Sequence, residues 1–213
     1  VDTVKSENEA GFAVTLRVFS EDGDSYKVFR TTKRGADLDV LLREASIEVV
    51  QHINPYVVAL YTRKTEAAEG NWDFPRTKAI ADEFLKQHPH EDHHLMLGLL
   101  GRMHMVKAES DNSLSPEQKT AEYDRAVELL NGAILQKPDF AVPYLNLAVI
   151  SQTRGQDSEA YKYFRRSAEL NPSFRLTRLL WGDFLYAQGR LAEAVAQYVA
   201  AVEINKKDPV VRN

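Results

Sequence analysis

Alternation of apolar and polar positions marks the start of the chain as a β-hairpin. Between Phe12 and Val18 an apolar residue stands at every second position, which is the period of a strand with one buried face. The pair Asp22-Gly23 follows, and Asp-Gly is a strong signal for a tight turn because both residues tolerate positive φ. Tyr26 to Thr31 forms the expected returning strand. A two-stranded ribbon is marginal by itself, so a further element must cover it.

The apolar spacing then changes to that of a helix. Asp37 is a suitable N-cap, and the helix should stop at Asn54 because the residue before Pro55 is disfavoured in helical conformation. The residues on its single apolar stripe are Leu38, Leu41, Leu42, Ala45, Val49 and Ile53. We therefore expect residues 1–54 to form a small αβ segment, a β-hairpin plus a helix.

From Pro55 onward the pattern is that of helix pairs repeated at a fixed interval. The pairs of residues separated by 34 positions are Pro55 and Pro89, Pro138 and Pro172, Gly155 and Gly189, Ala160 and Ala194, and Phe164 and Tyr198. A fixed period of about 20–50 residues is typical of a solenoid of stacked units. Pro89 and Pro138 lie 49 residues apart, which is 34 plus 15. We assign the additional residues to a polar insertion at about 107–118, in the turn between two helices.

Two successive segments, 141–174 and 175–208, carry matching residues at the same positions. The matching pairs are Ala148 and Gly182, Gly155 and Gly189, Ala160 and Ala194, Phe164 and Tyr198, and Ser167 and Ala201. Pro172 ends the first segment, whereas Lys206 takes its place in the second. Through these residues the chain resembles the tetratricopeptide repeat (TPR) family, in its bacterial type. Small residues let two antiparallel helices approach, glycine reverses the chain, and proline ends the second helix.

Two earlier units match the family less completely. The unit 58–91 retains Tyr61, Phe84 and Pro89 but has Thr77 where the family has a smaller residue. The unit that contains the insertion retains Gly98, Ala126, Ala133 and Pro138. The resemblance implies a mainly α fold. It predicts a right-handed α-solenoid of about four helical hairpins over residues 55–213, preceded by the β-hairpin and helix.

The resemblance also implies a function and a site. Family members are non-enzymatic scaffolds for protein–protein interaction, and the first helix of each hairpin lines a concave groove that binds a peptide or a helix. The groove positions that carry over to this chain are Arg63, Glu66, Arg102, Val142, Asn146, Gln152, Asp183 and Tyr186. Of a carboxylate-binding clamp only Asn146 is present, since leucines occupy the other positions. The groove would therefore suit an extended peptide or helix with apolar anchors.

Charge and composition narrow the class of partner. The net charge is −4 with both signs interleaved, so no basic patch for nucleic acid is predicted. No apolar run reaches the length of a membrane span, so we expect no direct membrane insertion by this segment. The chain has no cysteine, which excludes disulfides and thiolate chemistry. The predicted partner is another protein or peptide, and no cofactor is implied.

One motif points to a different class of function. His90-Glu91-Asp92-His93-His94 matches H-E-x-x-H, in which two histidines one helical turn apart bind zinc and the glutamate acts as a base. A zinc peptidase is thus a distant alternative. Pro89 directly precedes the motif and its flanks are polar, which is the wrong context for a buried zinc helix. We expect a solvated turn between repeats, no enzyme, and at most weak, adventitious metal binding by His90 and His94.

A third interpretation is a structural or oligomerisation module of a larger membrane-anchored protein. Leu176, Leu179 and Leu180 could then dock a second copy, because a last repeat without a polar capping helix leaves an apolar face open. The N-terminal segment looks like the stretch that leads into repeat arrays in some bacterial envelope proteins. That likeness slightly favours a periplasmic or membrane-anchored location over a cytoplasmic one.

Overall fold

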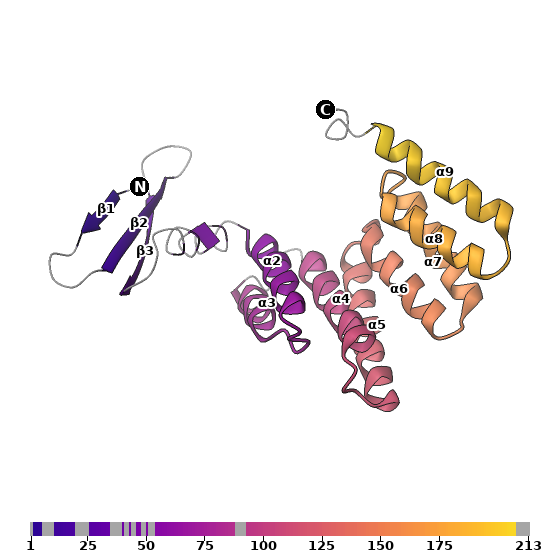
Figure 1. Cartoon of the computed structure of the whole chain (residues 1–213), viewed down its shortest axis with the longest axis horizontal. Coiled ribbons are helices and arrows are strands. Elements are labelled where there is room, and N and C mark those ends of the chain that lie inside the picture. The colour runs from indigo at the N-terminus through magenta and orange to yellow at the C-terminus, as the bar shows by residue number, and fades with distance from the viewer. Residues whose placement is uncertain are drawn as a thin grey trace. The chain divides into compact units, whose positions relative to one another are not determined.

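Helices in consecutive pairs make up the part of the chain that follows Pro55 (Figure 1). The computed structural model describes residues 2–5, 11–19, 26–34, 40, 43, 46, 47, 50, 54–87 and 93–207. The helices are α2 (Pro55–Ala68), α3 (Pro75–Gln87), α4 (His94–Ser110), α5 (Pro116–Gln136), α6 (Ala141–Thr153), α7 (Asp157–Leu170), α8 (Arg175–Ala187) and α9 (Leu191–Lys207). These are the helix pairs that the 34-residue interval predicts.

The N-terminal segment contains an antiparallel sheet of three strands. The strands are β1 (Asp2–Lys5), β2 (Gly11–Phe19) and β3 (Tyr26–Arg34), in the order β1-β2-β3. Strands β2 and β3 pair from Gly11 opposite Arg34 to Phe19 opposite Tyr26. The Asp-Gly turn expected between them lies outside the described residues, and β1 was not predicted. Of the helix expected at 38–53, the described residues 40, 43, 46, 47 and 50 are all helical.

The chain divides into two compact units. The first comprises Val1–Glu69 with Pro75–Gln87, and the second comprises Gly70–Phe74 with His88–Asn213. The hairpin α2–α3 therefore belongs with the N-terminal segment, and the unit boundary does not coincide with the predicted domain boundary at residue 54. The second unit holds three hairpins: α4–α5, α6–α7 and α8–α9.

The core of the last two hairpins is built by the residues that carry the repeat. Ala160 and Phe164 of α7 are fully buried, and the Phe164 ring lies 5.4 Å from that of Phe184 on α8. Ser167 is also buried, and its hydroxyl donates to the carbonyl oxygen of Ala141 at 3.0 Å. The repeated positions of α7 thus hold it to the start of α6 and, through the aromatic rings, to α8.

The glycines between the helices of these hairpins are required by backbone conformation. Gly155 has φ +69° and Gly189 has φ +72°, in the left-handed region that favours glycine. In the turn at Gly189, between α8 and α9, the N–H of Arg190 donates to the Leu185 carbonyl at 2.9 Å. This is the bond that ends a helix in a Schellman motif. No heavy atom would lie within 4 Å of a Cβ at either glycine, so conformation rather than space selects it.

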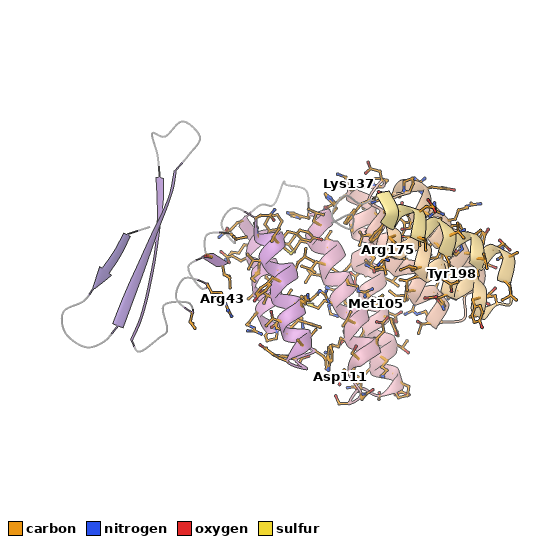
Figure 2. The ribbon with its side chains drawn as sticks, turned by 45° about the horizontal axis from the view of Figure 1, so that its top comes forward. Arg43, Met105, Asp111, Lys137, Arg175 and Tyr198 are labelled. Carbon is orange, nitrogen blue, oxygen red and sulfur yellow. The ribbon has the colours of Figure 1, made fainter. Side chains whose placement is uncertain are left out.

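The predicted insertion takes a different form from the expected loop. Residues 107–110 belong to α4, which has 17 residues, and α5 has 21 residues, so the additional residues lengthen both helices. The connection is only 111–115, with Asp111 at its start (Figure 2). A capping box between Ser115 and Gln118 begins α5. The polar residues that indicated a loop therefore lie mainly on solvated helix faces.

Candidate functional site

The first helices of successive hairpins carry the polar residues that the sequence places in a groove. Within the second unit these helices are α4, α6 and α8. Arg102 of α4 donates from Nη1 to the side-chain oxygen of Asn146 on α6 at 3.2 Å, which joins two hairpins across 44 positions of sequence. Asn146 is only 2% exposed, and its Nδ2 atom has no hydrogen-bond partner among the described residues. The partly exposed side chain of Arg102 is therefore the member of the pair that a ligand could contact directly.

Apolar and polar residues of α6 extend this face along the helix. Val142 lies four positions before Asn146 and Val149 three positions after it, so the three share one helix face. Val142, Val149 and Gln152 are each partly exposed. The predicted residues of α6 therefore come together as a continuous strip around the Arg102–Asn146 pair.

Helix α8, the first helix of the last hairpin, adds an acidic group and an aromatic side chain to this face. Asp183 is exposed and accepts a hydrogen bond from the hydroxyl of Tyr198 on α9 at 2.7 Å (Tyr198 is labelled in Figure 2). This hydrogen bond, burial and the charge of Asp183 raise the pKa of the Tyr198 hydroxyl. Tyr186 is 64% exposed. Both predicted residues of α8 are thus open to a partner, although one oxygen of Asp183 is already engaged.

Glu66 was predicted as a groove residue, and the structure gives it another role. Its carboxylate is fully buried and accepts from the backbone N–H of Arg76 at 2.8 Å, the backbone N–H of Thr77 at 3.1 Å and the Thr77 hydroxyl at 2.6 Å. These are N–H groups of the first turn of α3, which have no partner inside their own helix. Glu66 therefore caps α3 from α2 and cannot contact a partner.

Arg63, the other predicted residue of α2, is partly buried in the first unit. Burial raises the pKa of the Tyr56 hydroxyl, and the positive charge of Arg63 opposes that shift, so the two side chains share one environment. Arg63 thus lies with α2 and α3, whereas Arg102, Asn146 and Asp183 belong to the second unit.

Of the histidine motif, the structure describes His93 and His94. His90 and Glu91 lie outside the described residues. His94 is 5% exposed, and its ring lies edge-on to Phe140 at 5.0 Å, which is the position of a core residue. Among the described residues no group of three His, Cys, Asp or Glu side chains is placed to hold a metal ion.

The open apolar surface of the last repeat lies on α9 rather than on the leucines of α8. Leu176 is 43% exposed, while Leu179 and Leu180 are partly buried. The exposed apolar residues of α9 are Leu191, Val195, Val199 and Val202. Their spacing of four, four and three positions is helical and visible in the sequence, so the same periodicity used for residues 38–53 could have found them.

Comparison with known proteins agrees with this architecture. A family model described as tetratricopeptide repeat matches residues 141–174, which are α6, α7 and the turns around them. A protein of Mycosarcoma maydis, small glutamine-rich tetratricopeptide repeat-containing protein 2, is 26% identical over 113 residues, or 53% of this chain. The matched stretch spans 31% of that protein's length.

Solved structures with a similar fold cover most of the chain. A thermophilic TPR protein of Thermus thermophilus aligns with a TM-score of 0.62 at 19% identity, over 82% of this chain and 90% of that one. MamA from Desulfovibrio magneticus aligns with a TM-score of 0.52 at 15% identity, over 80% of this chain and 92% of that one. At these identities the likeness concerns the fold alone.

None of the described helices is both long and apolar enough to cross a membrane.

Proposed function

The chain is a tetratricopeptide repeat protein, and from this premise we propose that it binds a peptide or helix of another protein along the face formed by α4, α6 and α8. Proteins of this family generally mediate protein–protein interactions. The proposed role is that of a scaffold, in which recognition alone is the activity and no bond is made or broken.

The unused amide of Asn146 is the observation that carries this proposal. A buried N–H without a partner costs roughly 1–3 kcal/mol, so a folded chain rarely retains one without a use. The cost is recovered when a ligand supplies an acceptor. Arg102 is the more exposed member of the pair and is the group that a partner would meet first.

The neighbours of this pair define the chemistry of the partner. A main-chain carbonyl or a carboxylate would bind at Arg102, whose guanidinium is a partly exposed donor, and would reach the buried Asn146 amide once the Arg102 side chain moves aside. Apolar side chains of the partner would pack on Val142 and Val149. A basic side chain or an N–H group would bind Asp183. An extended peptide or an amphipathic helix supplies these groups in sequence along a face of three helices.

Selection of a ligand followed by substitution tests the proposal. A peptide would be selected from a randomised phage library on the immobilised 213-residue chain, and its affinity measured by calorimetry. Asn146→Ala should weaken binding by roughly 0.5–1.5 kcal/mol, about 2- to 10-fold, because one hydrogen bond is lost. Asp183→Lys should weaken a peptide with a basic residue by a similar factor or more.

The matched control is Arg165→Glu, an exposed residue on the second helix α7. We expect it to bind the selected peptide as the unchanged chain does, with all variants retaining their helical circular dichroism. If Arg165→Glu abolishes binding and the Asn146 and Asp183 variants bind normally, the binding surface is formed by the second helices and the proposal is wrong.

A further inference from the structure

The first helix of the hairpin α4–α5 is longer than the first helices that follow it. In α4, α6 and α8 a small residue stands seven positions after the first residue of the helix, and these residues are Gly101, Ala148 and Gly182. In this alignment α6 and α8 both end after 13 residues, whereas α4 has 17 and continues through residues 107–110. Asp111, labelled in Figure 2, marks the end of this extra turn. The extra turn lengthens the face of α4, α6 and α8 on the side of α4.

Glu109 is the residue of the extra turn that shares a helix face with Arg102. The two residues are seven positions apart, which is two helical turns, so they lie one above the other on α4. Because Arg102 donates to the side chain of Asn146, this face of α4 is turned toward α6. Glu109 therefore lies at the end of the boundary between α4 and α6.

Tyr123 of α5 lies beside Glu109 and connects it to the end of α6. Burial and the negative charge of Glu109 raise the pKa of the Tyr123 hydroxyl, while a hydrogen bond with Thr153 and the charge of Arg154, both from the end of α6, oppose that rise. The Tyr123 side chain is buried, whereas that of Glu109 is exposed. Of these two side chains, Glu109 is the one that a ligand can reach.

The cations closest to Glu109 along α4 and at the end of α6 have other partners. The ion pairs and their N–O distances are Lys107 with Asp73 at 2.8 Å, Lys107 with Glu122 at 2.9 Å, and Arg154 with Asp124 at 2.6 Å. Arg102 donates to Asn146. Glu109 itself makes no hydrogen bond and no ion pair with any residue that the structure describes, although the charge of Arg102 acts on it from a distance.

The surroundings of Glu109 favour a cationic ligand. The neighbouring helices remove part of the hydration of its carboxyl group and thereby raise its pKa, and the positive charge of Arg102 reduces that rise. A carboxylate that has lost part of its water without gaining a hydrogen-bond donor is stabilised when a ligand brings a positively charged donor to it. Lysine and arginine side chains are such donors.

On the basis of the binding function proposed above, we propose that Glu109 accepts a lysine or arginine side chain of the bound partner and so selects which peptides or helices the face of α4, α6 and α8 holds. Glu109 and Arg102 are separated by about 10 Å along α4. A partner whose main chain passes Arg102 can therefore extend a long basic side chain to Glu109. Asp183 is on α8, about 16–20 Å further across the face, so one basic residue cannot pair with both acids.

Two selections from one randomised peptide library test this role. One selection uses the unchanged 213-residue chain and the other uses Glu109→Lys. Peptides from the first should share a lysine or arginine at one position, and peptides from the second should have an aspartate or glutamate there. The matched control is Glu128→Lys, which makes the same change of charge at an exposed position of the second helix α5. It should select the same basic residue as the unchanged chain.

Calorimetry then measures the pair directly, with one peptide from the first selection and its variant in which glutamine replaces the basic residue. Glu109→Gln should weaken binding of the basic peptide about 3- to 10-fold, because a partly desolvated charge pair is lost. The glutamine peptide should bind the unchanged chain and Glu109→Gln equally well. This coupling between one residue of the chain and one of the peptide is not expected from a general change in charge or fold.

The outcomes separate the role of Glu109 from the binding function on which it rests. Peptides that Asn146→Ala and Asp183→Lys weaken, but that share no basic residue or bind Glu109→Gln unchanged, would overturn the role of Glu109 and leave the groove as the binding surface. A shared basic residue that couples to Asp183 and not to Glu109 would overturn it as well. If no peptide binds the unchanged chain, the proposed function fails and the role of Glu109 fails with it.

Discussion

At the scale of single residues, Glu66 shows how tertiary contacts decide what a charged side chain does. Burial by itself would raise the pKa of this carboxyl group, but the hydrogen bonds from the Thr77 side chain and from the backbone N–H groups of Arg76 and Thr77 outweigh burial, and the pKa is lowered. The positive end of the α3 dipole acts in the same direction. The carboxylate is therefore a fixed anion that holds the start of α3 against α2.

The lowered pKa predicts how stability depends on pH. Because the pKa of Glu66 is lower in the folded chain than its unfolded value of about 4.3, the ionised group stabilises the fold above that value. This stabilisation is lost as the pH falls through the folded pKa. Glu66→Gln should lower the free energy of unfolding at pH 7 by roughly 1–3 kcal/mol, and should remove part of the acid dependence. Urea denaturation at pH 7, 5 and 3.5 measures both effects.

Glu69 provides the control for that measurement. Its carboxylate accepts from Arg76 Nη2 at 2.5 Å, but both side chains are about half exposed, and such ion pairs contribute little because water screens them. Glu69→Gln should therefore change the free energy of unfolding by less than about 1 kcal/mol. Equal losses for the Glu66 and Glu69 variants would show that the cap does not hold α3.

At the scale of elements, the distance between two helices is set where side chains are smallest. A Cβ at Gly182 would lie 2.5 Å from the Tyr198 ring, and one at Gly101 would lie 2.7 Å from Leu130 Cγ. Gly98, which the sequence assigned to the close approach of its hairpin, meets the Phe140 ring at 3.2 Å instead. Gly101 is thus the residue that lets α4 and α5 approach, as Gly182 does for α8 and α9.

Alanine substitution separates close approach from helix propensity. Gly101→Ala should destabilise the chain by roughly 1–3 kcal/mol, because its methyl group would overlap the Leu130 side chain and come within 3.2 Å of the Ala126 carbonyl oxygen. Gly132→Ala adds the same methyl group at an ordinary contact distance of 3.5 Å from Leu97, and should stabilise by up to about 1 kcal/mol through helix propensity. Thermal and urea unfolding report the sign of each change, and two changes of the same sign would contradict this packing.

In the long hairpin α4–α5, one residue of the predicted insertion, Lys107, packs against other elements and does not lie on a solvated face. Lys107 and Glu122 are polar residues that pack between the helices as an ion pair of 2.9 Å, and Lys107 also pairs with Asp73 at 2.8 Å. Glu122 in addition contacts His104 Nδ1 at 2.6 Å. A sequence pattern counts such residues as solvated. Their partners come from other elements, so only the folded pair reveals that they belong to helices.

At the scale of the whole molecule, the division into two compact units bears on how the chain unfolds. Glu66 and the hairpin α2–α3 belong to the first unit, and Ala160 of α7 belongs to the second. Each unit has its own packed residues, and units that unfold separately give separate transitions in a heat-capacity scan.

Two substitutions assign those transitions. Ala160 is fully buried, so Ala160→Leu should lower the midpoint of the second unit by overpacking, at a cost of roughly 1–3 kcal/mol, and should leave the other transition in place. Glu66→Ala should lower only the transition of the first unit. Lys162→Leu, at an exposed position of α7, is the matched control and should change neither. A single transition lowered by both Ala160→Leu and Glu66→Ala would show that the chain unfolds as one unit.

The sequence by itself determined the features that recur at the fixed 34-residue interval. The turn glycines Gly155 and Gly189, the small residue Ala160 and the aromatic Phe164 lie where the 34-residue interval placed them, and the resemblance to the family rests on them. Their roles follow from local conformation and from neighbours a fixed number of positions away, so a linear pattern contains the whole constraint.

Other features were decided only by the tertiary structure. The burial of Glu66, the pairing of Asn146 with Arg102, and the close approach at Gly101 all join residues of different helices. Whether a polar side chain faces a partner, a helix end or another side chain depends on the angle and spacing of the helices that bring it there. No local pattern encodes that angle, because it results from the packing of all the side chains between the helices at once.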